Sequence, residues 1–203
     1  MTVDLNGATL NIQTRQNLMG RFRQRFAYAN AHKTVDEKRR IFERALASDG
    51  FAKSAVERME HGDLYAVDDT LKVTASYRLT DYAIASGGMI YLKMFLNVPT
   101  NEFIDPDKRR LGYETNARHE YRWTQNIAIP EGYNVEFLPE KVNFEHPLFA
   151  FSANAVHDGC NIIVTAFYNT DFNTLTQTDY NEWNDMNNKI RQFCNQFIVL
   201  KHN

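Results

Sequence analysis

The residues best suited to chemistry are six histidines and two cysteines, and their spacing matches no recognised site. No histidine stands in an H-x-x-x-H spacing, and the chain has no C-x-x-C pair. The six histidines are His32, His61, His119, His146, His157 and His202. We therefore predict no metal site and no cofactor in this chain.

The two cysteines are poorly placed for nucleophilic catalysis, because a reactive thiolate usually lies at a helix N-terminus or beside a cation. Cys160 follows the turn signal Asp158-Gly159. Cys194 falls in the last turns of a predicted helix, where the helix dipole disfavours a thiolate. Two cysteines make no disulfide framework, although a single bridge stays open if the protein is exported. With no G-x-S-x-G, Walker A or G-x-G-x-x-G motif either, we expect no enzyme activity.

The composition is that of a globular protein of moderate size. Its 203 residues are 43% hydrophobic and 24% charged, which suits one or two buried cores. The formal net charge of -2 argues against a nucleic-acid binder, which usually carries a basic excess. No apolar run approaches the roughly 20 residues that cross a bilayer. A strand-like pattern begins almost at Met1 without a signal-peptide layout, which suggests a fragment of a longer protein.

Hydrophobic periodicity predicts a strand, two helices and a second strand in the first half of the chain. Residues 8–14 alternate and predict a half-buried strand, whereas steps of three and four over residues 15–29 predict an amphipathic helix. Thr34, with Glu37 three residues later, is the capping box of a second helix that would form a hairpin with the first. Residues 71–80 alternate over five apolar positions, which is typical of an antiparallel strand with one buried face.

The second half of the chain reads as a series of antiparallel strands. Residues 121–129 alternate with a lapse at Gln125, which suggests a β-bulge. Further alternating runs cover residues 133–137, 142–144, 149–155 and 162–168. Asp158-Gly159 is a two-residue hairpin signal between the last two of these runs.

A C-terminal helix completes the predicted architecture. Asp179, with Glu182 three residues later, resembles its cap, and an apolar face extends to Phe197. We predict an α+β fold, mainly antiparallel β sheet and sandwich-like, with an N-terminal helical hairpin and a C-terminal helix packed on the sheet. Residues 1–105 and 106–203 form the predicted N-terminal and C-terminal portions, with one continuous domain as the alternative.

Five side chains are candidates for a recognition surface. Residues 100–116 are polar and contain Pro106, so we expect a long surface loop or a subdomain boundary there. The candidates are Arg109 and Arg110 of this segment, with Tyr82, Tyr91 and Tyr113. Solvated loop charges and ordinary core tyrosines are the competing interpretation of the same residues.

Several short motifs occur in an order that resembles a known arrangement of domains. They are the strand Leu71–Leu79, the segment Ala85–Leu92, the run Asp107–Arg110, the segment Ile129–Val135 with Leu138-Pro139, and a final helix ending in Ile198–Lys201. In this order they resemble the C-terminal region of bacterial exported proteins. Those proteins combine an N-terminal β domain of unknown function, a transglutaminase-like core and a C-terminal domain of unknown function.

The resemblance implies that the catalytic Cys, His and Asp of such a protein lie in the core, upstream of Met1. No catalytic residue carries over to this chain, and the upstream core is its implied partner. The parent protein would be periplasmic or extracellular. We therefore interpret the chain as a non-catalytic accessory domain, structural or recognition, of an exported transglutaminase-like protein. An independent cell-surface module that binds peptide or glycan is the alternative, and an enzyme with a dispersed site is a third class.

Overall fold

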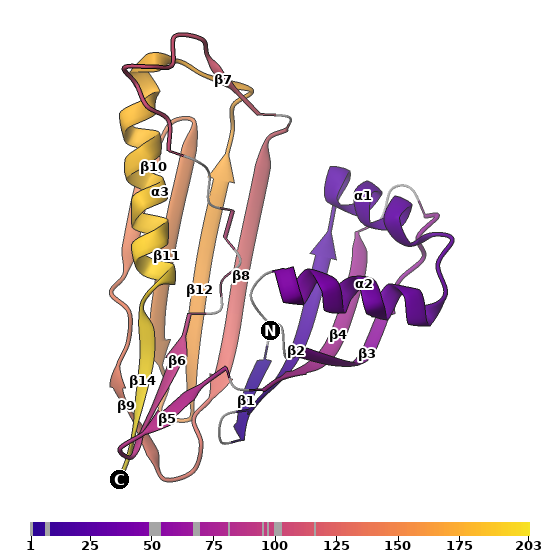
Figure 1. The fold of residues 1–203 in the computed structure, drawn as a ribbon, viewed down its shortest axis with the longest axis vertical. Coiled ribbons are helices and arrows are strands. Elements are labelled where there is room, and N and C mark those ends of the chain that lie inside the picture. The colour runs from indigo at the N-terminus through magenta and orange to yellow at the C-terminus, as the bar shows by residue number, and fades with distance from the viewer. Residues whose placement is uncertain are drawn as a thin grey trace. The chain divides into compact units, whose positions relative to one another are not determined.

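The computed structural model describes residues 2–6, 9–48, 54–66, 70–80, 82–94, 96, 98–99, 103–115 and 117–203. The chain divides into two compact units, Met1–Ala85 and Ser86–Asn203, and the division falls within β5 (Ile84–Ser86). Two N-terminal helices, a C-terminal helix and antiparallel strands confirm the predicted α+β class (Figure 1).

The first unit contains an antiparallel sheet and two helices that lie between its second and third strands along the chain. Its described strands are β1 (Thr2–Asn6), β2 (Thr9–Leu18), β3 (Ser54–His61) and β4 (Leu71–Leu79), paired in the order β1-β2-β4-β3. Helices α1 (Gly20–Asn30) and α2 (Val35–Ser48) follow β2. The predicted alternation of β4 is confirmed, because its odd-numbered side chains are all buried and the even-numbered ones are not.

The first helix begins later than its periodicity suggested. Residues 15–18 continue β2 and pair with β4, from Arg15 opposite Thr74 to Leu18 opposite Leu71. Gly20, with a φ of 50°, then begins the helix in a conformation that glycine adopts without a Cβ clash. The prediction of a helix from residue 15 was wrong because pairing with a long neighbouring strand outweighs local helical periodicity.

Both helices pack on the buried face of this sheet. Phe26 of α1 packs against an apolar cluster that includes Leu71 and Val73 of β4. Phe42 of α2 meets Tyr77 of the same strand edge to face, with ring centroids 5.6 Å apart. The alternating apolar residues of β4 therefore form the surface against which both helices pack.

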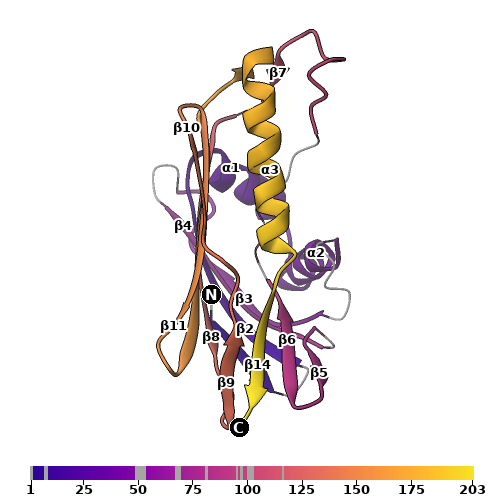
Figure 2. The same cartoon turned by 90° about the vertical axis from the view of Figure 1, so that its left-hand side faces the viewer.

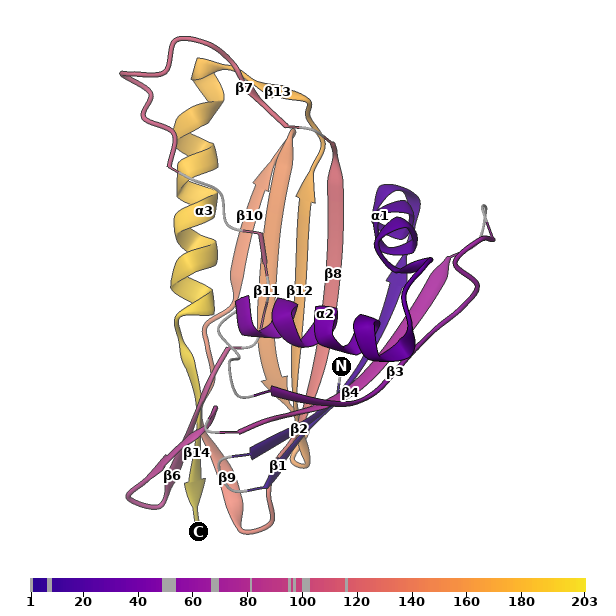
Figure 3. The same cartoon turned by 45° about the vertical axis from the view of Figure 1, so that its right-hand side comes forward.

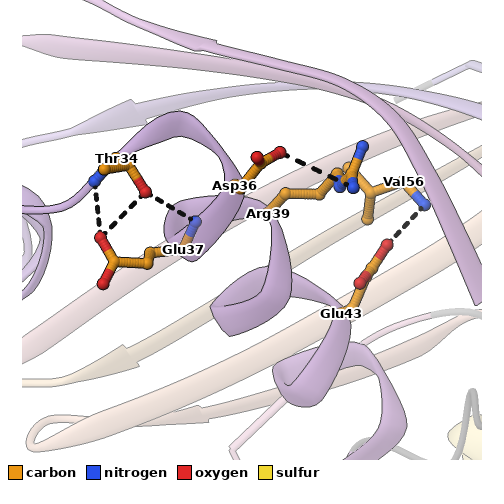
Figure 4. Close-up of polar contacts among 6 residues, drawn as sticks. All are labelled: Thr34, Asp36, Glu37, Arg39, Glu43 and Val56. Carbon is orange, nitrogen blue, oxygen red and sulfur yellow. Dashed lines mark hydrogen bonds and ion pairs between the residues drawn. The ribbon is translucent and has the colours of Figure 1, made fainter.

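Helix α2 starts at the predicted capping box (Figure 4). The backbone N–H of Thr34 donates to Glu37 Oε2 at 2.8 Å, and the backbone N–H of Glu37 donates to Thr34 Oγ1 at 3.3 Å. The backbone bond from Thr34, followed by the one from its hydroxyl, holds the pKa of the Glu37 carboxyl below its usual value. Further along the helix, Glu43 Oε1 accepts the backbone N–H of Val56 at 3.4 Å, which ties α2 to β3 (Figure 4).

One charged side chain of α1, that of Arg23, is almost fully buried. Arg23 is 7% exposed, and its Nε and Nη2 have no hydrogen-bond partner in the described part of the chain. We expect Arg23→Met, which keeps the apolar stem, to raise the free energy of unfolding of the first unit by about 1–3 kcal/mol, because unpaired buried donors are destabilising. Native-state hydrogen exchange of the β2 and β4 amides measures this change. Exposed Arg25→Met is the control, and lower protection in the Arg23 variant alone would contradict the expectation.

The described part of the second unit contains two antiparallel sheets, a short ladder and one α-helix. The first sheet pairs β10 (Val142–His146), β11 (Phe149–His157), β12 (Asn161–Thr170) and β8 (His119–Ala128) in that order. In the second sheet, β14 (Phe197–His202) lies between β6 (Met89–Lys93) and β9 (Tyr133–Phe137). The short ladder joins β7 (Tyr113–Glu114) to β13 (Thr174–Leu175), and η1 (Gln177–Asp179) leads into α3 (Tyr180–Cys194).

Helix α3 lies along one face of the first of these sheets, as predicted (Figure 2). Its buried side chains face β10 and β11, and Phe193 meets Phe151 edge to face with centroids 6.4 Å apart. Phe151 itself is fully buried, at 0% exposure. The helix therefore seals the core of the second unit.

The predicted bulge at Gln125 is absent from the pairing of β8 with β12. Gln125 stands opposite Val164 in a register that runs without a shift from His119 to Ala128. Its side chain is 3% exposed, on the same face as buried Ile127. The prediction was wrong because a buried polar residue can keep its place in a regular alternation.

The hairpin between β11 and β12 turns one residue later than its sequence signal suggested. The backbone N–H of Asp158 donates to the carbonyl of Asn161 at 3.0 Å, so Gly159 and Cys160 form the tip. Gly159 has a φ of 97°, which a side chain would disfavour. The Asp158 carboxylate accepts the backbone N–H groups of Asn161 at 2.7 Å and Cys160 at 2.9 Å, and these bonds lower its pKa.

Both ends of the C-terminal helix differ from prediction. The capping box is formed by Thr176 and Asp179 at the start of η1, rather than by Asp179 and Glu182. The helix ends at Cys194, and Phe197 opens the strand β14. The apolar residues beyond Cys194 suit a strand as well as a helix, and pairing with β6 and β9 decides the outcome.

Candidate functional site

The residues from Phe103 to Thr115, which we call the 103–115 loop, gather most of the predicted recognition residues. Apart from β7, this segment has no strand or helix of its own. It passes around the N-terminal end of α3 before it reaches β7 (Figures 1 and 3). A long irregular segment in this position depends on side-chain contacts to hold its shape.

Helix α3 holds the backbone of the 103–115 loop through two side chains. Asn184 Oδ1 accepts the backbone N–H of Ile104 at 2.9 Å, and its Nδ2 donates to the carbonyl of the same residue at 2.7 Å. The Tyr180 hydroxyl donates to the carbonyl of Leu111 at 2.8 Å. The side-chain amide of Asn184 thus satisfies the buried peptide groups of Ile104 as a neighbouring strand would.

The end of the 103–115 loop packs closely against β13. Glu114 stands opposite Thr174, and Tyr113 stands opposite Leu175. A Cβ on Gly112 would lie 2.6 Å from Cγ2 of Thr174, a separation that real Cβ atoms do not show. Glycine at this position therefore allows the loop to approach β13.

A pocket of about 340 Å³ opens on the 103–115 loop. It is lined by Phe103, Ile104, Asp105, Lys108, Arg109 and Tyr113. The Arg109 guanidinium lies over the Tyr113 ring, 5.3 Å from its centroid. Its Nε and Nη2 also donate to the carbonyls of Leu111 at 3.2 Å and Gly112 at 3.1 Å. Arg109 is therefore fixed in place rather than free in solvent.

The surface of the 103–115 loop combines positive charge with exposed apolar side chains. Lys108 Nζ pairs with Asp105 at 3.0 Å, and hydrogen bonding from Lys108 is the main factor that lowers the pKa of Asp105. Arg110 is exposed and makes no polar contact with the described residues. Phe103 is 63% exposed and Leu111 is 80% exposed. A partner could therefore contact aromatic, aliphatic and cationic groups within one short segment.

The structure brings together Arg109 and Tyr113 among the predicted recognition residues, and Arg110 adjoins them in the chain. Tyr91 lies on β6, at the opposite end of α3 from the 103–115 loop, and its hydroxyl donates to Met89 Sδ at 3.2 Å (Figures 1 and 2). Tyr82 belongs to the first unit, and its burial raises the pKa of the phenol. Arg109, Arg110 and Tyr113 therefore share one loop, and Tyr91 lies apart from them within the second unit.

Sequence reasoning missed Phe103 and Leu111 as functional candidates. Both are large apolar residues in a polar segment that contains Pro106. That contrast was a usable signal, because an apolar residue in a predicted surface loop has no core to enter. Asn184 was missed as well, and no local feature of the sequence marks it as the anchor of this loop.

The thiols of the chain lie in unreactive or isolated positions. Cys160 is exposed at the hairpin tip, and Cys194 is partly buried at the end of α3; both are free cysteines. Burial raises the pKa of the Cys194 thiol to about 11, so very little of it is thiolate at neutral pH. The described residues contain no group of three or more His, Cys, Asp or Glu side chains that could hold a metal ion. Nor does any described helix have the length and apolar character needed to span a membrane.

Residues 88–200 match the family model described as "Domain of Unknown Function with solved-structure structure (DUF3858)". The matched segment includes the 103–115 loop, α3 and the strands of the second unit from β6 to the first part of β14. No curated protein and no solved structure shows a significant match to the chain.

Proposed function

This chain belongs to the DUF3858 family of domains of unknown function, and we propose that it is a non-catalytic accessory domain of a larger protein. Its role is to dock another domain of that parent through the 103–115 loop. We further propose that the parent is an exported, transglutaminase-like protein of the bacterial periplasm or exterior. The order of sequence motifs supports this parentage, and the docked partner is then the upstream transglutaminase-like domain.

The observation that carries the proposal is the exposed apolar surface of an anchored loop. Phe103 and Leu111 are 63% and 80% exposed, and Arg109 and Arg110 lie between them in the chain. Aromatic and arginine side chains are enriched among the residues that dominate binding energies at protein interfaces. Because Asn184 already holds the loop on α3, little conformational entropy is lost when a partner binds.

The state of the thiols supports a non-catalytic role. A nucleophilic cysteine needs a lowered pKa and a neighbouring base, whereas burial raises the pKa of the Cys194 thiol to about 11. Cys160 lies on an exposed hairpin tip, where its backbone N–H is bound by Asp158. Neither thiol has the surroundings that activate a cysteine.

The test measures association between the 203-residue chain and the upstream domain of its parent, produced as a separate protein. Isothermal titration should detect binding, and Phe103→Ser combined with Leu111→Ser should weaken it by at least about tenfold, as expected for two hot-spot residues. Phe137→Ser, at an aromatic residue that is 47% exposed on β9, is the matched control. Equal affinity in the double variant and the wild type would contradict docking through this loop.

Activity assays test the proposal that the domain is non-catalytic. The chain should show no transamidase or protease turnover. Turnover that disappears in Cys160→Ser or Cys194→Ser would overturn the non-catalytic assignment.

The pocket beside Tyr113 favours the alternative of an independent cell-surface module that binds peptide or glycan. A fixed arginine over an aromatic ring, next to a cavity of about 340 Å³, could receive one residue of such a ligand. Binding of an oligosaccharide or a peptide to the isolated chain, lost in Tyr113→Ala, would support this alternative over docking of an upstream domain.

A further inference from the structure

The first unit contains a pocket that plays no part in the proposed docking function. It has a volume of about 420 Å³ and lies between the start of α2 and the end of β3. Its lining residues are Val35, Lys38, Met59, Glu60 and His61, and we call it the Lys38 pocket.

A lysine and a histidine in direct contact form the polar part of the Lys38 pocket. Lys38 Nζ lies 2.8 Å from His61 Nε2, and His61 Nδ1 lies 2.8 Å from the carbonyl oxygen of Gly62. An ammonium can only donate and a carbonyl can only accept, so these contacts assign the imidazole proton to Nδ1 and the lone pair to Nε2. The ring also meets Phe26 edge to face, with centroids 6.2 Å apart, which helps to fix its orientation.

The positive charge of Lys38 is not neutralised within the described part of the chain. The acidic neighbour of Lys38 in the chain, Glu37, and the acidic residue of the pocket lining, Glu60, are engaged elsewhere. Glu37 bonds back to Thr34 in the capping box, and Glu60 pairs with Arg58 at 2.6 Å. The ammonium has three N–H donors and gives one of them to His61, so it retains donors and a full charge for a ligand.

Apolar side chains line the Lys38 pocket beside this charge. Val35 is 77% exposed on the first turn of α2, and Met59 is half-buried on β3. A ligand that placed an aliphatic group against both residues would remove apolar surface from water. The pocket therefore offers one cationic group and one apolar wall at close range.

We propose that the Lys38 pocket binds a carboxylate that carries an apolar group. A single ammonium matches the single charge of a carboxylate, and the Glu60 carboxylate in the lining repels a doubly charged phosphate more strongly than a singly charged carboxylate. The positive charge of Lys38 disfavours a metal cation in the same pocket. A volume of about 420 Å³ suits a small organic acid or the last residue of a peptide.

The test titrates the full 203-residue chain with N-acetyl-leucine and follows the His61 imidazole and Met59 methyl signals by NMR. A saturable shift is expected. Lys38→Met should weaken binding by about fivefold, the effect typical of a partly exposed ion pair, and Lys38→Arg should retain it. Lys72→Met, at an exposed lysine on the opposite face of β4, is the control and should bind as the wild type does. Unperturbed amide spectra of the first unit would show that each variant is folded.

The neutral probe N-acetyl-leucine amide separates charge recognition from simple apolar binding and should bind more weakly than the acid. A short peptide that ends in leucine with a free carboxyl group tests the source of the carboxylate. Tighter binding than N-acetyl-leucine would identify a peptide C-terminus as the ligand, and equal binding would identify a small acid. Equal affinity for acid and amide, unchanged affinity in Lys38→Met, or no saturable shift at millimolar probe would each overturn the proposal.

Discussion

Replacement of Trp183 by alanine is expected to lower the free energy of unfolding of the second unit by about 3–5 kcal/mol. Trp183 is 1% exposed on α3. Its ring meets Phe149 at 5.1 Å and Phe172 at 5.4 Å between centroids, at interplanar angles of 82° and 90°. These edge-to-face contacts join the helix to β11 and to the segment after β12. Alanine would leave a cavity where these elements meet.

Urea unfolding followed by tryptophan fluorescence measures this loss. The chain contains two tryptophans, Trp123 and Trp183, and both lie in the second unit, so the signal of Trp123 reports that unit in the variant. Trp183→Phe is the matched control. It keeps an aromatic ring and removes a buried indole N–H that has no partner in the described part of the chain, so we expect a loss of about 1 kcal/mol or less. Equal losses in the two variants would contradict the cavity argument.

Strands with one buried and one exposed face could be predicted from the sequence. The alternating residues of β4 and β11 place their apolar side chains on the core face, as their period of two indicates. The capping box of α2 could also be predicted, because its partners Thr34 and Glu37 are three residues apart. Where the contacts that decide the structure join residues close together in the chain, the sequence pattern is sufficient to predict that structure.

Predictions failed where distant pairing decides the structure. Phe197 fits the apolar face of a longer C-terminal helix, yet it begins β14 because β6 and β9 supply hydrogen-bonding edges on both sides. In the same way, Leu18 fits a helical face but extends β2 opposite Leu71. In both cases the local sequence is compatible with helix and strand, and the neighbouring strand selects one of them.

In the candidate site, too, local features could be predicted from the sequence and contacts between distant residues could not. The polar, Pro-containing segment predicted a surface loop, and Arg109 with Tyr113 could be singled out within it. The anchor of the loop could not be found, because Asn184 lies 80 positions from Ile104 in the sequence. A buried asparagine on a mostly apolar helix face resembles a lapse in periodicity, and its role appears only when the loop backbone lies against it.

Asn184→Leu is expected to release the 103–115 loop from α3. Leucine has a similar volume but cannot bond to the backbone of Ile104, so a buried N–H and a buried carbonyl lose the partners that Asn184 supplies at 2.9 and 2.7 Å. Two unsatisfied buried groups destabilise the anchored loop by about 3 kcal/mol. The equilibrium therefore shifts toward the released loop by roughly a hundredfold. Limited trypsin digestion should therefore cut after the loop's basic residues much faster than in the wild type. Asn181→Leu, at an exposed position of the same helix, should match the wild type, and equal cleavage rates in the two variants would contradict the anchoring role.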